Sequence, residues 1–175
     1  MCAGFPLEVL GVSIRTSEAL YQAMRFPQSP EIQREILDER SPMAAKMRSK
    51  KYQPRYLRAD WDELRVEIMW WVLNVKLLQN STSFGTLLKK SGSAAIVEES
   101  AKDSFWGATR VGDHHVGANT LGRLLMNLRA RGSTTSIATP DIGLRLLGEE
   151  IPSELVATSN IARPAATLTQ LEFDL

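Results

Sequence analysis

Cysteine and histidine are almost missing from this chain: Cys2 is its one cysteine, and His114 and His115 are its two histidines. A single cysteine excludes a disulfide within the chain and a cysteine-based zinc site. No apolar run approaches the roughly 20 residues of a membrane span, and the N-terminus lacks the basic and apolar segments of a signal peptide. We therefore expect a cytoplasmic protein that does not enter the membrane.

The sequence also lacks the common catalytic and cofactor-binding motifs. It contains no P-loop, no GxGxxG that follows a strand and no HExxH. Two neighbouring histidines cannot easily serve one site, and no serine nucleophile motif accompanies them. We therefore expect neither a metal ion nor a cofactor, so the chemistry falls to carboxylates, amides and lysine.

The composition is that of an ordinary globular domain. Apolar residues make up 43% and charged residues 23%, and the net charge of +1 gives no general attraction to nucleic acid. The charge is uneven, however, because no acidic residue interrupts a basic stretch formed by Lys46, Arg48, Lys50, Lys51, Arg55 and Arg58. This stretch is either a solvated basic loop or a patch that faces the phosphates of a nucleotide or nucleic acid.

Apolar spacing and capping residues predict mainly helical structure after an N-terminal strand–turn–strand over residues 5–14. The expected helices cover residues 17–26, 30–39, 43–48, 61–78, 82–90 and 118–129. The longest should be a core helix whose tryptophans pack, with Asp60 and Glu63 at capping-box spacing. We also expect a short buried strand at 94–98, a loop at 107–117, an edge strand at 142–147 and a loose C-terminal tail.

Two segments carry polar side chains suited to a site. Glu18, Tyr21, Gln22 and Arg25 share one face of the first helix, which is either exposed or lines a pocket. The segment 98–107 (EESAKDSFWG) follows the expected strand, where a turn can present Asp103 and Trp106 to one ligand.

Two helix ends add further candidates. Lys76, Gln79 and Asn80 end the long helix and can hydrogen-bond a sugar or a base. Asn119 begins the last helix, and a helix N-terminus can hold phosphate.

Several segments occur together in an order that resembles the YbiA-like, or NADAR, family over about residues 5–131. They are TSEALYQAMRF (16–26), SPMAAK (41–46), RADWDELRVEIM (58–69), KLLQN (76–80), IVEES (96–100), DSFWG (103–107) and GANTLGRLLMNLR (117–129). The chain departs from the family pattern at Ile14-Arg15, where Trp-Pro is frequent, and at Ser49-Lys50, where Gly-Arg is common. Family members also begin with a Phe-Ser-Asn-like segment, which would lie just before Cys2.

The resemblance implies an α+β fold, a predominantly helical single domain packed around a small β-sheet. It places the catalytic domain at residues 1–132 and leaves 133–175 as a C-terminal extension. It also implies a hydrolase that cleaves N-glycosidic bonds to ribose, with pocket residues at matching motif positions. These residues are Glu18, Tyr21, Gln22, Lys46, Gln79, Asn80, Glu98, Asp103, Trp106, Gly107, Asn119 and Gly122.

Within that set, the resemblance implies roles for individual residues. We assign Glu18 as the base or electrostatic partner at the sugar, and Asp103 to orienting the ribose or water. Trp106 would stack on the base, while Gln79 or Asn80 would read its polar edge. Lys46 has two open roles, pairing with a phosphate or forming a Schiff base with an opened ribosylamine.

Family members act on two substrate classes. One is ADP-ribose attached to guanine in DNA, removed by antitoxins of DarT-type ADP-ribosyltransferases, and the basic stretch favours it. The other comprises the ribosylamino-pyrimidine phosphates of riboflavin biosynthesis. The expected partners are thus ADP-ribosylated DNA or a ribosyl nucleotide, with a DarT-type toxin as functional partner. A module that binds ADP-ribose or a nucleotide without turnover is the alternative from another class.

Overall fold

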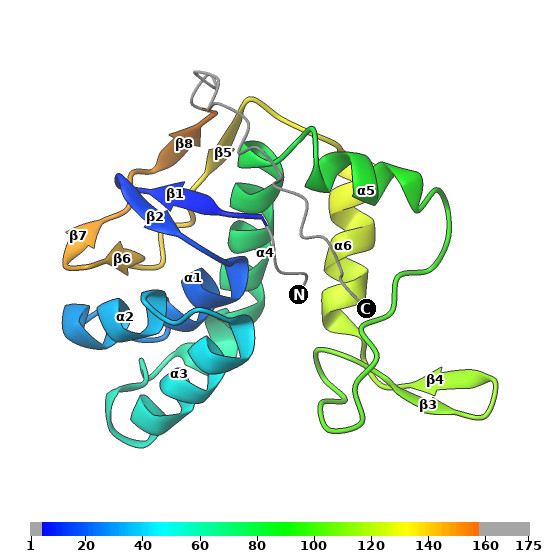
Figure 1. The fold of residues 1–175 in the computed structure, drawn as a ribbon, viewed down its shortest axis with the longest axis horizontal. Coiled ribbons are helices and arrows are strands. Elements are labelled where there is room, and N and C mark those ends of the chain that lie inside the picture. The colour runs from blue at the N-terminus through cyan, green and yellow to red at the C-terminus, as the bar shows by residue number, and fades with distance from the viewer. Residues whose placement is uncertain (1–4, 158–175) are drawn as a thin grey trace, which may run out of the picture.

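The computed structural model describes residues 5–157 and has an α+β architecture, as predicted. Its described residues form six helices and eight short strands (Figure 1). The strands pair as four separate two-stranded antiparallel units rather than as one sheet. No helix in this described part is both long enough and apolar enough to cross a membrane.

The N-terminal hairpin is the expected strand–turn–strand. Strand β1 (Leu7–Val9) pairs with β2 (Val12–Ile14), with Leu7 opposite Ile14. The turn between them places Leu10 and Gly11 at φ of 52° and 71°, a left-handed conformation that glycine adopts without strain. Because Leu7, Val9 and Ile14 are buried, this hairpin contributes one apolar face to the core.

Three helices follow and pack against one another: α1 (Ser17–Ala23), α2 (Pro30–Leu37) and α3 (Pro42–Tyr56). The Thr16 side chain accepts a hydrogen bond from the Ala19 amide and so caps α1. Ser41 caps α3 in the same way. Both caps satisfy backbone amides that the helix itself leaves without partners.

Helix α3 is longer than predicted, since the expected end near residue 48 is wrong. The helix continues to Tyr56 and includes Pro54. Tyr52 packs its ring edgewise against Phe26 of the core, with centroids 6.5 Å apart, and Ser49 is fully buried. Tertiary packing therefore offsets the backbone hydrogen bond that proline removes, and the basic stretch is helical from Lys46 to Arg55, with Arg58 beyond the end of the helix.

Helix α4 (Trp61–Gln79) is the centre of the core, as its apolar stripe predicted. It contacts α1, α5, α6, β1 and β5, and it stands between the α1–α3 layer and α6 (Figure 1). Trp61 and Trp71 are 5% and 2% exposed, so both tryptophans pack as expected.

The predicted capping box at the start of α4 is wrong. The Asp60 side chain makes no cap hydrogen bond and instead accepts two from the Arg58 guanidinium, at 2.6 and 3.0 Å. Nη2 of Arg58 also donates to the Ile142 carbonyl oxygen. An arginine fork binds a carboxylate more strongly than a single backbone amide does, which explains the competition.

The Arg58–Asp60 pair predicts a pH-dependent contribution to stability. Hydrogen bonds from Arg58 hold the pKa of Asp60 below its ordinary value. Because the folded pKa is depressed, the stabilisation is present above the unfolded pKa of about 3.9 and is lost as pH falls through the folded pKa. Asp60→Asn should lower the melting temperature at pH 7 and have little effect at pH 2. An equal loss at both pH values would contradict this.

The predicted strand at 94–98 is wrong, and its residues are mostly exposed. The chain there is extended but pairs with a side chain instead of another strand. Nδ2 of Asn119 donates to the Ile96 carbonyl oxygen at 2.8 Å, and Oδ1 accepts from the Glu98 amide at 3.0 Å. One parallel bridge follows, between Glu99 and Ala108.

The predicted loop at 107–117 is also wrong, because it contains a hairpin. Strand β3 (Thr109–Val111) pairs with β4 (His114–Val116) around a turn at Gly112, whose φ is 59°. Helix α5 (Phe84–Lys90) precedes it and α6 (Thr120–Arg131) follows it, close to their predicted positions. The hairpin projects from the body of the molecule (Figure 1).

The extension after residue 132 is more ordered than predicted. It forms β5 (Ser136–Ala138), β6 (Arg145–Leu146), β7 (Glu149–Glu150) and β8 (Glu154–Val156), with β5 paired to β8 and β6 to β7. The predicted edge strand at 142–147 is reduced to β6. The predicted loose tail from residue 158 onward lies outside the described residues.

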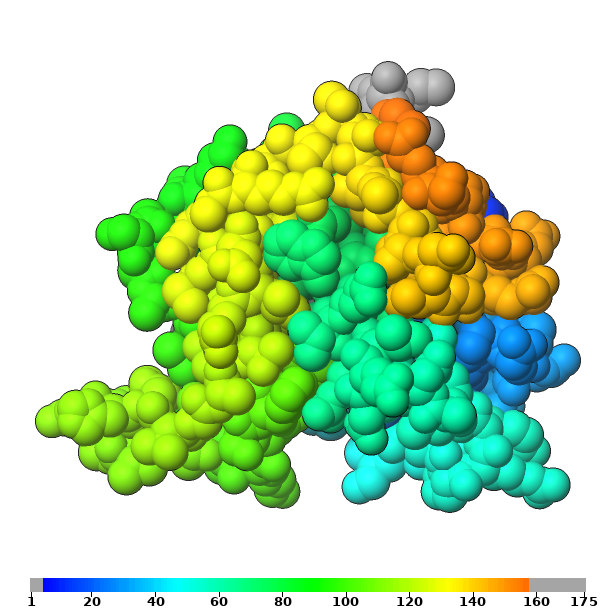
Figure 2. Space-filling view, turned by 180° about the vertical axis from the view of Figure 1, so that it is seen from behind, coloured from blue at the N-terminus to red at the C-terminus, as the bar shows by residue number. Residues whose placement is uncertain are grey.

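The extension shares the hydrophobic core of the rest of the chain. Ile137, Leu144, Leu146 and Ile151 are buried in the same cluster as α4. Fully buried Gln33 on α2 fixes the turn after β6 by donating to the Arg145 carbonyl oxygen and accepting from the Leu147 amide. Figure 2 shows this segment, yellow to orange, arched around α4 on the far side of the molecule from Figure 1.

Candidate functional site

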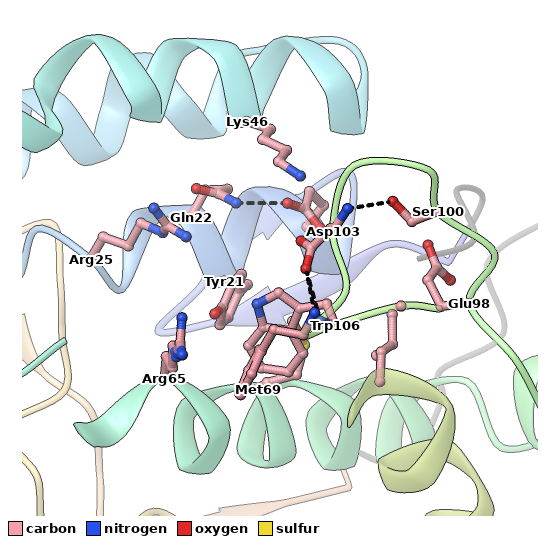
Figure 3. A pocket seen from close by; sticks show the side chains of 14 residues that line it. Tyr21, Gln22, Arg25, Lys46, Arg65, Met69, Glu98, Ser100, Asp103 and Trp106 are labelled. Atoms are coloured by element: carbon pink, nitrogen blue, oxygen red, sulfur yellow. Dashed lines mark hydrogen bonds between the residues drawn. The ribbon is translucent and has the colours of Figure 1, made fainter. Parts of the chain in front are cut away.

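A pocket of about 280 Å³ opens between α1, α3, α4 and the segment 98–107 (Figure 3). Its lining residues are Glu18, Tyr21, Gln22, Arg25, Lys46, Arg65, Met69, Glu98, Ser100, Asp103, Phe105, Trp106, Gly107 and Leu121. Segments more than 100 residues apart in sequence thus meet at one cavity. It combines carboxylates, cations and aromatic rings, as sites for small polar ligands do.

The polar face of α1 forms one wall of this pocket, so of the two alternatives the structure shows a pocket-lining face rather than an exposed one. Nε2 of Gln22 donates to Oε1 of Glu18 at 2.7 Å, which orients the carboxylate. Tyr21 and Gln22 are both 2% exposed. Burial is the main cause that raises the pKa of Tyr21, so its hydroxyl stays protonated.

The opposite wall is a tight turn built by Asp103. Oδ1 of Asp103 accepts hydrogen bonds from the amides of Phe105 and Trp106, at 3.2 and 2.9 Å, and the Asp103 amide donates to Oγ of Ser100. The turn presents Asp103 and Trp106 to the same cavity, as expected (Figure 3). One oxygen of Asp103 is therefore used in fixing the turn.

Close backbone packing behind this turn explains Gly107. A Cβ at residue 107 would collide with the Glu98 carbonyl oxygen and lie 2.9 Å from Cβ of Ser100. Its role is steric, because any side chain would push the wall segments apart. Trp106, which lies against this backbone, meets Tyr21 edge-on with ring centroids 5.8 Å apart.

Lys46 is exposed on α3 and extends toward the pocket from the third wall (Figure 3). It is the residue that connects the basic stretch to the pocket. The basic patch is smaller than the sequence suggests, because Arg48 is paired with Glu35 and Glu39 and Arg58 with Asp60. The exposed basic residues on α3 are Lys46, Lys50, Lys51 and Arg55.

Sequence reasoning missed Arg65, Met69, Ser100, Phe105 and Leu121 as lining residues. Arg65 and Met69 stand one turn apart on α4, in the part of the helix whose apolar stripe predicts only core packing. Trp61, Arg65 and Met69 are spaced four residues apart and so share one face of α4. Trp61 packs against Tyr21 of α1, so this spacing in the sequence indicated that Arg65 and Met69 face α1 as well.

Gln79 and Asn80 lie outside the pocket lining, contrary to the predicted role at the base. Oε1 of Gln79 accepts from the Glu8 amide at 2.8 Å, and Nε2 donates to the Glu8 carbonyl oxygen at 2.7 Å. Nδ2 of Asn80 donates to the carbonyl oxygens of Pro6 and Lys76. Both amides therefore hold the N-terminal hairpin on α4.

This placement predicts the effect of Gln79→Ala. Two backbone hydrogen bonds to Glu8 are lost, which should lower the free energy of unfolding by about 1–2 kcal/mol. The substrate affinity should change little, since the side chain points to β1. Chemical denaturation and KM measured on the same preparation would check this. A raised KM with unchanged stability would restore the role at the base.

Asn119 and Gly122 also lie outside the pocket lining, contrary to prediction. Asn119 has a left-handed backbone with φ of 47°, and its side-chain amide hydrogen-bonds to the backbone of Ile96 and Glu98. A Cβ at residue 122 would collide with the Ile96 carbonyl oxygen. The start of α6 is therefore occupied by the chain's own backbone and is not a free phosphate site.

No group of metal-binding side chains occurs among the described residues. His114 and His115 lie on the exposed hairpin, where Nε2 of His115 is 3.3 Å from Oε2 of Glu99. Neither histidine lines the pocket. The pocket itself offers carboxylates, a lysine, two arginines and aromatic rings.

The sequence of this chain is similar to those of several known proteins. The riboflavin biosynthesis protein VVA0006 of Vibrio vulnificus is 37% identical over 123 residues, which are 70% of this chain and 32% of that protein. The N-glycosidase YbiA of Escherichia coli is 35% identical over 128 residues, 73% of this chain and 76% of that protein. This chain thus spans about a third of the first relative and three quarters of the second.

A solved structure agrees with these matches. The NMR structure of the E. coli protein YbiA superposes with a TM-score of 0.61 at 32% identity, covering 72% of this chain and 71% of that one. The sequence pattern of the NADAR domain matches residues 5–131, which extend from the N-terminal hairpin to the last residue of α6. The chain therefore belongs to the YbiA-like NADAR family.

Proposed function

We propose that this chain is an N-glycosidase that hydrolyses the bond between C1′ of a ribose and a nitrogen atom. The observation that carries the proposal is the Glu18 carboxylate, oriented by Gln22 in a pocket that also holds Trp106 and Lys46. The relative named N-glycosidase YbiA shares this domain over 73% of the chain. Hydrolysis of a glycosidic bond needs a carboxylate near the sugar, and the pocket supplies one.

Unsatisfied polar atoms in the pocket support a polar ligand. The Tyr21 hydroxyl, Gln22 Oε1, Arg25 Nε and Arg65 Nε are buried and have no hydrogen-bond partner among the described residues. Each such atom costs about 1–3 kcal/mol when it stays unpaired. Four of them at one cavity are accounted for by a bound ligand with several oxygen and nitrogen atoms.

The reaction follows from the charges that develop. As the C1′–N bond breaks, positive charge builds on C1′ and the ring oxygen, and the electron pair leaves with the base. Glu18 stabilises that positive charge and takes a proton from the water that adds to C1′. The leaving nitrogen gains a proton, so the products are a free sugar and a free base. Asp103 orients the ribose or the water, and Trp106 stacks on the base.

Lys46 allows a covalent variant. A ribosylamine that opens to an iminium can exchange its nitrogen for the lysine Nζ, giving a Schiff base that water later hydrolyses. Pairing of Lys46 with a phosphate is the simpler role, because the side chain is exposed on a basic helix. Borohydride during turnover leaves a covalent adduct in the first case and none in the second.

For the substrate we favour ADP-ribose attached to guanine in DNA, supplied by a DarT-type ADP-ribosyltransferase. The exposed residues Lys46, Lys50, Lys51 and Arg55 make the surface of α3 basic from the pocket to the C-terminal end of the helix, which suits a phosphate backbone. Nζ of Lys51 lies 5.2 Å from the centroid of the Tyr52 ring, and Cζ of Arg55 lies 5.6 Å from the centroid of the Tyr56 ring. These stacked cations are held in place for contact with an anionic strand.

A second candidate substrate is a ribosylamino-pyrimidine phosphate of riboflavin biosynthesis. The relative from Vibrio vulnificus is named a riboflavin biosynthesis protein, and the match covers 70% of this chain. The pocket volume of about 280 Å³ suits a single ribosyl unit with its base. This substrate needs no contact beyond the pocket.

A paired incubation tests both candidates. ADP-ribosylated guanine DNA is added to one tube and ribosylamino-pyrimidine phosphate to the other, and released sugar is read by mass. Release of ADP-ribose from DNA supports the first substrate, and release of ribose phosphate alone supports the second. ADP-ribose binding without product in either tube would replace the N-glycosidase with a binding module.

A further inference from the structure

Two arginines stand together at one end of the pocket, away from its acidic end. Arg25 in the turn after α1 and Arg65 on α4 both line the cavity, and Figure 3 shows them at the end opposite Glu98 and Ser100. Two guanidinium groups carry like charges that repel each other, so placing both at one end of the pocket costs free energy.

Aromatic rings hold both guanidinium groups in place. Cζ of Arg25 lies 4.4 Å from the centroid of the Trp61 ring, and Cζ of Arg65 lies 3.9 Å from that of Phe105. Stacking orients the planar fork of an arginine and leaves its N–H edge free to donate. Both forks are therefore set in position before any ligand arrives.

The two arginines are short of anionic partners within the protein. No described carboxylate lies within 4.0 Å of the Arg25 guanidinium, and Arg65 has only the exposed Asp62, with Nη1 to Oδ1 at 3.6 Å. Nε of each arginine is buried without a hydrogen bond, as is the nearby Tyr21 hydroxyl. Burial is the main cause that lowers the pKa of Arg25, the nearby Tyr21 hydroxyl and Glu18 carboxylate oppose this shift, and the guanidinium stays charged.

We propose that Arg25 and Arg65 form an anion subsite that binds the phosphoryl group on C5′ of the substrate's ribose. This inference rests on the proposed function, which takes ribose as the sugar. Two forks and one hydroxyl supply several donors from different directions, and a phosphoryl group has three oxygens to accept them. A carboxylate has two oxygens in one plane and leaves donors unmet.

The subsite would set the direction in which the sugar lies. With the phosphoryl group at the Arg25 and Arg65 end, the anomeric carbon and base extend toward Asp103 and Trp106. ADP-ribose carries a diphosphate on C5′ and a ribosylamino-pyrimidine carries a monoester, so both candidate substrates meet the same donors.

Ligand binding tests this without any turnover. Ribose, ribose 5-phosphate and ADP-ribose are titrated into the folded chain by calorimetry. The wild type should bind ribose 5-phosphate at least about tenfold more tightly than ribose. Arg65→Gln should remove that preference, Arg65→Lys should keep part of it, and Arg34→Gln, at an exposed position of α2, should have no effect. Arg25→Gln should behave like Arg65→Gln if thermal unfolding shows it to be folded.

The outcomes separate the subsite from the reaction. Equal binding of ribose and ribose 5-phosphate by the wild type would overturn the subsite, and so would an Arg65→Gln variant that loses ribose as strongly as the phosphate. An arginine-dependent preference for ADP-ribose over ribose 5-phosphate supports a diphosphate occupant, and equal affinities support a monoester. A chain that shows this preference but cleaves neither substrate would keep the subsite and refute the N-glycosidase.

Discussion

Glu18→Gln is expected to lower kcat by about 10²–10⁴-fold, the usual contribution of a positioned acid or base. Glutamine has the same shape and keeps an oxygen that can accept the hydrogen bond from Gln22, so the α1 wall should stay intact. What disappears is the negative charge that opposes the developing charge on the sugar. Binding of ADP-ribose or ribose 5-phosphate should therefore change little.

The matched control for this variant is Glu31→Gln. Glu31 is also in the first turn of a helix, α2, and it is exposed and outside the pocket. It shares the same favourable position near a helix N-terminus, so it tests for a general charge effect. Single-turnover rates for both variants, with melting temperatures, separate the two. A Glu18→Gln enzyme that turns over like the wild type would remove Glu18 from the mechanism.

Gly122→Ala is expected to destabilise the chain by about 1–3 kcal/mol, as overpacking in a tight interior does. The new methyl group would collide with the Ile96 carbonyl oxygen and lie 2.5 Å from the side-chain amide atoms of Asn119. Both neighbours are tied to each other by a hydrogen bond, so neither can move alone. The segment that leads to Glu98 should shift, and substrate affinity should fall together with stability.

Gly85→Ala provides the comparison, because Gly85 is likewise a buried glycine inside a helix. Its nearest neighbour would be the terminal Cδ1 of Leu77 at 3.1 Å, which can rotate away. Alanine also favours the helix by up to about 1 kcal/mol over glycine. Urea unfolding of both variants should give a large loss at residue 122 and almost none at residue 85. Similar values for the two would contradict the packing argument.

The sequence alone predicted that the polar residues of α1 share one face, because this depends on local rules, but it left open whether that face is exposed or lines a pocket. A helix repeats every 3.6 residues, so Glu18, Tyr21 and Gln22 had to share one side, and the Thr16 cap fixed where the helix begins. The apolar stripe predicted α4 for the same reason. When the residues that determine a helix and its faces all lie within that helix, their spacing in the sequence is sufficient to predict both.

Errors arose where a distant partner decides the local structure. Residues 96–98 look like a buried strand, yet their partner is the side chain of Asn119 on the other side of the hairpin. Gln79 was predicted to contact the base, but its side chain hydrogen-bonds to the backbone of Glu8 in β1. The helix predicted to end near residue 48 continues to Tyr56, where Tyr52 packs against Phe26. Pairings of this kind depend on tertiary contacts that no local pattern records.

The shared core has a consequence for how far the chain can be shortened. The NADAR match ends at Arg131, but Ile137, Leu144, Leu146 and Ile151 are buried against the rest of the molecule. Removal of the residues after 132 would expose apolar side chains of the shared core, including part of α4, to water. Surfaces of that kind promote self-association. Aggregation, rather than a lost catalytic group, would then be the reason for its inactivity.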